Sequence, residues 1–271
     1  MLRKLIKHEF RATARVMGPL FLIMLALALT ANLSLRFMLD SKIFIISFLG
    51  GLLLVAFTVG LFAMIVMSIV LMVNRFRTNL MGDEGYIMFT LPASSHKLVW
   101  SKIIVSSVWF IAAGVVDFFA GMIAFCDLDV LRDIFSSASF TNIVDGFAYL
   151  LREYGVNVPL AAAEILLLCL LGCAVMCLQF YAALAVGHSF DNHKMALSVA
   201  FFFGIQFAFQ FVGGMITYAI DQFGMFYWDW DLTSVAETHL FLGVCILAEA
   251  LVGGAYYLIT TVMLNKRLNL Q

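Results

Sequence analysis

Six long apolar blocks, separated by shorter polar segments, set the pattern of this chain. Each block is long enough to cross a membrane as a helix, because a helix rises about 1.5 Å per residue and the hydrocarbon is about 30 Å thick. The blocks lack the alternation of membrane β-strands, and lipid offers no partner to unpaired backbone groups. The pattern therefore predicts an all-α integral membrane protein with about six transmembrane helices; five or seven are the alternatives. The predicted spans are Val16–Leu35, Ile43–Val73, Ile103–Cys126, Val158–Val186, Met195–Ile220 and Leu240–Leu264.

Composition agrees with this prediction and excludes a soluble domain. Hydrophobic residues make up 63% of the chain and charged residues 12%, whereas a soluble domain is about 25% charged. We expect one transmembrane domain over residues 1–271. No glycine is followed by lysine, so a phosphate-binding loop of the Walker A type is excluded. Any energy source is therefore an ion gradient or another polypeptide.

Basic residues predict the orientation. Of the 16 lysines and arginines, 12 fall in segments 1–15, 74–102, 187–194 and 265–271, and only 4 fall in segments 36–42, 127–157 and 221–239. Cytoplasmic loops carry the excess of positive charge. We therefore expect both termini in the cytoplasm and the segments 127–157 and 221–239 outside.

The first fifteen residues have a helical pattern of their own. Leu2, Leu5, Ile6 and Phe10 share one face, and the basic residues share another. This predicts an amphipathic helix that lies in the inner membrane interface before the first span, with membrane lipids as its partner. A cleaved signal peptide is the alternative, because Ala26, Leu27 and Ala28 form a weak cleavage pattern.

Two groups of potential metal ligands have simpler explanations. Cys169, Cys173 and Cys177 recur every four residues on one helical face. Three thiolates suit a soft metal, but small residues also favour close helix packing, and we expect packing. His188 and His193 flank a short turn without an obvious third ligand, so we expect a solvated loop there. We expect no metal, no cofactor and no nucleic-acid partner on this chain.

The segment 74–102 is the most informative one. It mixes apolar residues with an acidic centre at Asp83 and Glu84, flanked by Gly82 and Gly85. An apolar surface around carboxylates suits docking into a partner with a basic-rimmed groove. The alternative is that Asp83 caps a short helix whose apolar face lies on the membrane.

The same segment carries a resemblance to a known family. Gly82, Asp83, Glu84, Gly85 and Tyr86, followed by Phe89-Thr90-Leu91-Pro92 and Ser101-Lys102, resemble bacterial permease subunits of ABC-2 type ABC transporters. The resemblance implies an exporter in the bacterial plasma membrane, in which two permease copies, as a homo- or heterodimer, assemble with two separate ATPase chains. It implies that Asp83, Glu84, Gly85 and Tyr86 contact the ATPase, with 187–194 as a smaller second contact. It also implies that ATP is hydrolysed on the partner, so that this chain is not an enzyme.

Three acidic residues fall within the predicted spans: Asp117, Glu164 and Glu249. Intramembrane acids are functional candidates, for example in a substrate or proton pathway. The alternative is a protonated carboxyl bonded to a neighbouring helix, with Gln206 or Gln210 as partners for Asp117 and Glu249. Glu164 follows Pro159 closely, and we expect it to remain hydrated near the outer surface.

Two other classes of protein fit the same pattern. A proton-coupled secondary transporter would use Asp117 and Glu249 as proton carriers and would need no ATPase. A non-transporting membrane scaffold or immunity protein would need neither the acids nor an ATPase. The aromatic and acidic run Tyr227–Asp231 suits an interfacial belt, with an exit gate as the alternative.

Overall fold

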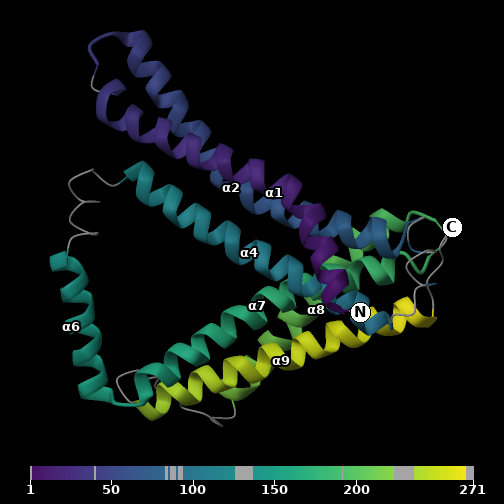
Figure 1. Cartoon of the computed structure of the whole chain (residues 1–271). Helices are drawn as coiled ribbons and strands as arrows, with labels where there is room; N and C mark the ends of the chain where they lie inside the picture. Colours follow the sequence, from purple (N-terminus) through teal and green to yellow (C-terminus); the bar gives the residue numbers. More distant parts are fainter. Residues whose placement is uncertain are drawn as a thin grey trace. The chain divides into compact units, whose positions relative to one another are not determined.

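The computed structural model describes residues 2–39, 41–82, 85, 90, 94–125, 137–190, 192–222 and 235–266. Within them the chain is all-α, with seven α-helices and one short π-helix (Figure 1). The elements are α1 (Leu2–Leu33), the π-helix η1 (Ser34–Met38), α2 (Phe44–Leu80), α4 (Ser95–Phe125), α6 (Ser137–Tyr154), α7 (Asn157–Gly187), α8 (Lys194–Gln222) and α9 (Val235–Lys266).

Six of these helices are long and apolar enough to cross a membrane, by length and composition. This confirms the number of spans predicted from the sequence. The helices extend beyond the predicted spans; α2 has 37 residues and is therefore roughly 55 Å long. Because the hydrocarbon is only about 30 Å thick, α2 is tilted or projects from the membrane.

The described chain falls into two compact units, which divide α2 and α4 between them. Unit 1 comprises residues 1–72 and 104–155, and unit 2 comprises residues 73–103 and 156–271. The two ends of the 74–102 segment therefore belong with α7, α8 and α9. The remaining parts of α2 and α4 belong with α1.

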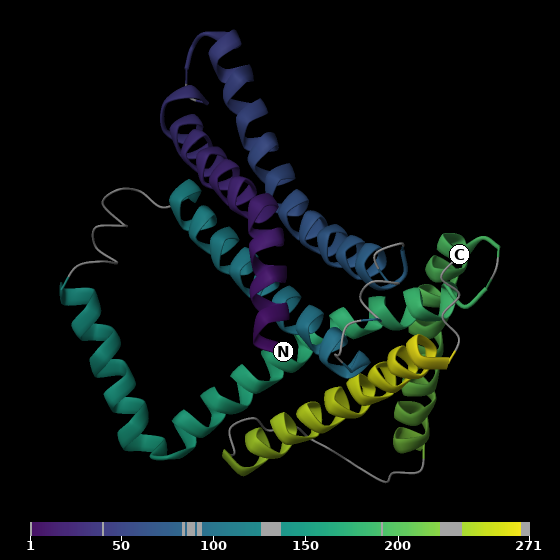
Figure 2. The same ribbon diagram turned by 45° about the vertical axis from the view of Figure 1, so that its right-hand side comes forward.

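Unit 1 has a core of methionine, alanine and aromatic side chains where α1, α2 and α4 run side by side (Figures 1 and 2). Small residues let these helices approach closely, as is usual in membranes. Gly60 of α2 faces α1, because a Cβ atom there would lie 2.9 Å from a methyl group of Leu27. The buried members of the core are Met17, Met24, Ala28, Ala31, Phe57, Met64, Ala113, Ala120 and Ala124.

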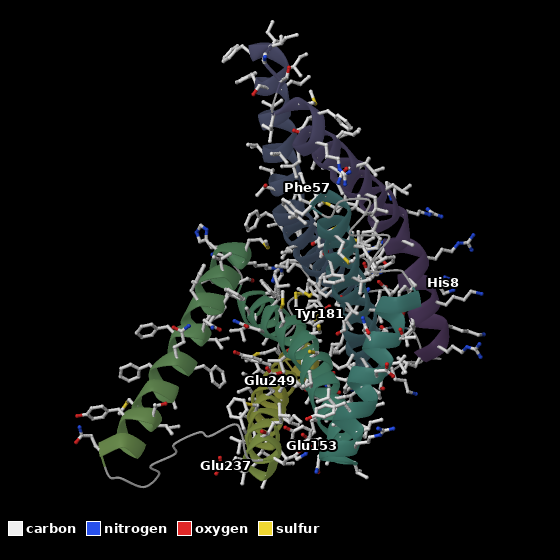
Figure 3. The ribbon with its side chains drawn as sticks, turned by 90° about the vertical axis from the view of Figure 1, so that its left-hand side faces the viewer. His8, Phe57, Glu153, Tyr181, Glu237 and Glu249 are labelled. Atoms are coloured by element: carbon white, nitrogen blue, oxygen red, sulfur yellow. The ribbon has the colours of Figure 1, made fainter. Side chains whose placement is uncertain are left out.

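Helix α1 is continuous across the predicted boundary between the interfacial segment 1–15 and the first span. Its first part packs on α4, where the indole N–H of Trp109 donates a hydrogen bond to Thr13 Oγ1 at 2.7 Å. The opposite face carries the exposed basic residues, and His8 projects from it (Figure 3). Packing on α4 thus fixes a segment for which the sequence indicated lipid alone.

Unit 2 is built on α7, which packs along α9 and also contacts α8. Close approach is set by glycine at two points. A Cβ atom on Gly253 of α9 would lie 2.9 Å from a methyl group of Val175, and one on Gly187 of α7 would lie 2.5 Å from the backbone nitrogen of Ser198. Contacts this short leave no room for a side chain.

Helix α6 lies inside the predicted outer segment 127–157, where the sequence analysis assigned no element. It ends at Tyr154, and Gly155 follows with a φ angle of 57°. The Gly155 N–H donates to the carbonyl of Leu151 at 2.9 Å, which is how a left-handed residue ends a helix.

The contact between η1 and α2 gives a testable consequence. Ser34 Oγ donates to the Gly50 carbonyl at 2.6 Å, and a Cβ atom on Gly50 would lie 2.8 Å from that of Met38 and 2.9 Å from the Ser34 hydroxyl. We expect Gly50→Ala to destabilise the protein by about 1–3 kcal/mol through overpacking. The measurement is the apparent melting temperature in mild detergent.

The neighbouring glycine provides the matched control. A Cβ atom on Gly51 meets no atom within 4 Å, so Gly51→Ala should leave the melting temperature unchanged or raise it slightly. Equal effects of the two substitutions would contradict the close packing of η1 on α2.

Candidate functional site

The candidate site is the 74–102 segment and the helix ends that hold it. Of the four residues expected to contact an ATPase, Asp83, Glu84 and Tyr86 lie outside the described residues. Gly85 is described; it is buried, and its N–H donates to the Gly82 carbonyl at 2.8 Å. Both the Met81 and the Gly82 N–H groups donate to the Arg77 carbonyl at 2.9 Å, which closes the end of α2.

An aromatic pair fixes the α2 end of the segment to α7. The rings of Phe76 and Tyr181 stack with centroids 3.9 Å apart and planes inclined by 8°. Both side chains are fully buried. Stacked aromatic pairs of this kind contribute about 0.5–1.5 kcal/mol beyond the area that they bury. Tyr181 is labelled on α7 in Figure 3.

Polar contacts fix the other end of the segment, the start of α4, to α9. Ser95 Oγ donates to Asn265 Oδ1 at 2.6 Å, and His96 Nδ1 and Tyr257 Oη form a hydrogen bond of 2.6 Å. The ring centroids of Trp100 and Tyr257 lie 6.0 Å apart. We call the seven side chains that fix the two ends the loop anchor: Phe76, Ser95, His96, Trp100, Tyr181, Tyr257 and Asn265.

Polar residues are buried around the loop anchor. Asn79 of α2 and Lys102 of α4 are each 4% exposed, and Thr260 of α9 is fully buried. The Thr260 hydroxyl donates to the Tyr256 carbonyl of its own helix at 2.8 Å. A lysine and an amide withdrawn from solvent are costly unless they are paired, so this end of unit 2 is organised by specific polar contacts as well as by packing.

The turn between α7 and α8, the expected second contact with an ATPase, packs into the same unit. His188 is the C-cap residue of α7 and is 7% exposed. Its Nδ1 lies 2.9 Å from the Leu184 carbonyl oxygen, so this nitrogen carries the proton. His193 is exposed and has a positive φ of 55°. Among the described residues, no group of three or more potential metal ligands includes either histidine.

The three cysteines of α7 differ in their surroundings. Cys169 is exposed, Cys173 is half-buried and Cys177 is buried. Cys177 is thus packed against neighbouring side chains, whereas Cys169 is not.

Two of the three intramembrane acids have a buried carboxylate oxygen. Neither Asp117 Oδ1 in unit 1 nor Glu249 Oε2 in unit 2 has a hydrogen-bond partner among the described residues. Glu249 faces α7, where a Cβ atom on Gly172 would lie 3.4 Å from its carboxyl (Figure 3). Of the two amides considered as partners, Gln206 instead accepts a hydrogen bond from Gln179 at 2.7 Å, and Gln210 is exposed.

Glu164, the third acid, is paired. Its Oε2 lies 2.8 Å from Nδ1 of His239, and the two side chains are 21% and 19% exposed. The pair joins the first half of α7 to the start of α9, so Glu164 has a structural partner at the end of the helices opposite the loop anchor. The sequence contained both residues but no pattern that linked them.

An apolar groove of about 360 Å³ lies between α1 and α2 in unit 1. Leu20, Met24, Ala56, Gly60 and Met64 are among its lining residues, and the whole lining is apolar. A groove without polar groups offers no means to orient a polar substrate or to catalyse a reaction. None of Asp117, Glu164 and Glu249 is among its described lining residues.

Sequence reasoning missed the loop anchor itself. Phe76 stands between two arginines in a basic helix end, and Tyr181 and Tyr257 fall near the ends of predicted spans. An aromatic residue in a basic helix end was a usable signal, although tyrosine at such a position is also typical of an interfacial belt. The partners of each ring come from helices distant in the sequence.

Together, the six apolar helices make this chain a multi-pass α-helical membrane protein. The comparisons with known proteins take the assignment no further. No protein-family model, no curated protein and no solved structure matches the chain.

The buried histidine of the α7–α8 turn predicts a pH dependence. Burial lowers the pKa of His188 below its ordinary value of 6.5, the hydrogen bond to Leu184 opposes this effect, and the charges of Lys194 and Arg77 reinforce it. Below about pH 6.5 this histidine therefore binds a proton in the unfolded chain more readily than in the folded protein. We expect the stability contributed by neutral His188 to be present above that pH and to be lost progressively as the pH falls.

The measurement is the apparent melting temperature in detergent between pH 7.5 and 5.5. We expect wild type to lose stability over this range and His188→Gln, whose amide also donates hydrogen bonds, to lose less. The exposed His193 gives the control, and His193→Gln should retain the wild-type slope. An unchanged slope for His188→Gln would show that another group titrates.

Proposed function

We propose that this chain is the membrane-spanning permease subunit of an ATP-driven exporter of the ABC-2 type, and that a separate ATPase chain docks on the 74–102 segment. The observation that carries the proposal is the loop anchor. Both ends of the segment are fixed to the long helices of unit 2, one by the Phe76–Tyr181 stack and the other by the His96–Tyr257 hydrogen bond. A docking surface held in this way is able to pass a movement on to the membrane helices.

The stiffness of these contacts supports the mechanism. Two fully buried rings in face-to-face contact do not slide apart without opening a void, because protein interiors are close-packed. When ATP binding draws two ATPase chains together, a docked segment moves with them. The loop anchor transfers this movement to α7 and α9, which shift as rigid elements and open a path for substrate.

The chemistry of the segment supports the choice of partner. Asp83 and Glu84 stand among apolar residues, and this combination suits a basic-rimmed groove on another protein. The distribution of basic residues predicts that the segment lies on the cytoplasmic side, where ATP is available. A second permease copy completes the assembly in this family, which the chain resembles in its 82–102 motifs.

The first test is affinity purification of the tagged protein from its native host in mild detergent, followed by mass spectrometry. We expect an ATPase subunit to copurify with wild type. Reversal of both charges, Asp83→Lys with Glu84→Lys, should reduce its recovery by about tenfold or more, because like charges then face a basic groove.

A matched charge reversal controls for general electrostatic effects. Asp145 and Glu153 are exposed acids on α6, in the segment expected on the other side of the membrane. Their replacement by lysine should leave the ATPase bound. The proposal fails if wild type brings down no ATPase in several mild detergents, or if both pairs of substitutions have the same effect.

One observation favours a second function, proton-coupled secondary transport. Asp117 and Glu249 each hold a buried carboxylate oxygen without a hydrogen-bond partner in the described structure, and such acids in spans are typical of proton carriers. This function needs no ATPase, so the same purification separates it from the first. If no ATPase is recovered, proton uptake by wild type and Glu249→Gln in vesicles becomes the next measurement.

A further inference from the structure

Helix α6 has two chemically distinct faces. At 100° per residue its apolar side chains cover one side of the helix and its polar ones the other. The large apolar side chains that the structure describes are those of Val144, Phe147, Leu150, Leu151 and Tyr154. The polar face carries Thr141, Asn142, Asp145, Tyr149, Arg152 and Glu153.

The apolar face is not covered by protein in the described structure. Val144 is 48% exposed, Phe147 51% and Leu151 38%. None of the α6 side chains that the structure describes is buried. A stripe of this kind is unfavourable in water, because burying apolar surface lowers the free energy by about 25 cal/mol for each Å² removed from water.

The chain holds α6 close to a membrane surface. Only Gly155 and Val156 separate its last residue, Tyr154, from the first residue of α7, so the two helix ends are within roughly 10 Å of each other. Helix α7 has 31 residues, a length of about 46 Å, which matches a bilayer of about 40–45 Å with its headgroups. The first turn of α7, and with it the end of α6, therefore lies at headgroup depth.

We infer that α6 lies along the membrane–water interface, with Val144, Phe147 and Leu151 among the acyl chains and Asp145, Tyr149 and Arg152 toward water. The partner of this surface is the lipid bilayer itself. The described polar face carries Asp145, Arg152 and Glu153, a nearly balanced set of charges. Apolar burial therefore drives the contact, and attraction to anionic lipid does not.

This inference is independent of the proposed ATPase partner. It requires that α7 spans the membrane, and it holds equally for an exporter, a proton-coupled transporter or a scaffold. Anchored at the surface, α6 limits how far the first turn of α7 can tilt or sink when the other end of that helix is moved.

The experiment places spin labels on the two faces in proteoliposomes of phosphatidylcholine. Single cysteines at Val144, Phe147 and Leu151 report on the apolar face, and single cysteines at Asp145, Tyr149 and Arg152 are the matched controls. The 5 native cysteines are replaced by alanine. Power-saturation EPR compares collisions with oxygen, which concentrates in lipid, and with a nickel chelate, which remains in water.

We expect labels on the apolar face to collide mainly with oxygen, at a depth of about 5–10 Å, and control labels to collide mainly with the chelate. Equal chelate access on both faces would overturn the inference, since α6 would then stand in water. Low access to both reagents on the apolar face would also overturn it, because another protein surface would cover that face.

Two further measurements guard against failure of the cysteine-free protein and test the role of charge. Hydroxyl-radical footprinting of wild type in nanodiscs should modify Tyr149 about tenfold faster than Phe147, as expected for opposite faces of an interfacial helix. The EPR depths should be the same when a third of the lipid is anionic. Similar rates for the two rings, or a depth that depends on anionic lipid, would count against an anchor driven by apolar burial.

Discussion

Hydrocarbon offers no hydrogen-bond partner to a backbone N–H or C=O group. The six long helices meet this constraint because each pairs its backbone groups internally. The same constraint acts on the side chains within the spans. Hydroxyl groups turn back onto their own helix, as Ser68 does to Met64 and Thr260 to Tyr256, both at 2.8 Å. Other polar groups pair between helices, as Gln179 does with Gln206. Once the backbone is satisfied within each helix, packing and a few polar pairs remain to decide which helices associate.

Close approach at small residues determines which helices associate. The absence of a side chain at Gly60 lets α1 lie close to α2, and its absence at Gly253 lets α7 lie close to α9. At Gly187 the end of α7 lies close to Ser198 of α8. Dispersion is short-ranged, so helices that approach closely at glycine gain contacts along much of their length. At the 74–102 end the aromatic and polar contacts of the loop anchor are added to this packing. Both ends of the 74–102 segment are thereby joined to the long helices α7 and α9.

The spans were predictable because their signal is local: an apolar stretch of sufficient length has one stable form in a bilayer. The continuity of α1 was less predictable from the sequence, because Pro19 and the change from basic to apolar residues both indicate a boundary between an interfacial helix and the first span. The contact of Trp109 with Thr13 joins residues far apart in the sequence. Helix α6 has a clear amphipathic pattern in Val144, Phe147 and Leu151. It has only 18 residues, many of them polar, so the length and apolar composition that identify a transmembrane span do not identify it. For the site, the sequence singled out the 74–102 segment but none of the side chains that fix it.

The sequence by itself determined that this is a helical membrane protein with about six spans, because hydrophobic length and the cost of unpaired backbone groups are properties of each segment alone. Through its basic residues it also predicted an orientation. Only the tertiary structure decided that Phe76 meets Tyr181, that His96 meets Tyr257 and that Glu164 meets His239. The physical reason is that lipid surrounds every apolar helix equally well. Partner choice therefore depends on the fit of small and aromatic side chains in three dimensions, which no single segment encodes.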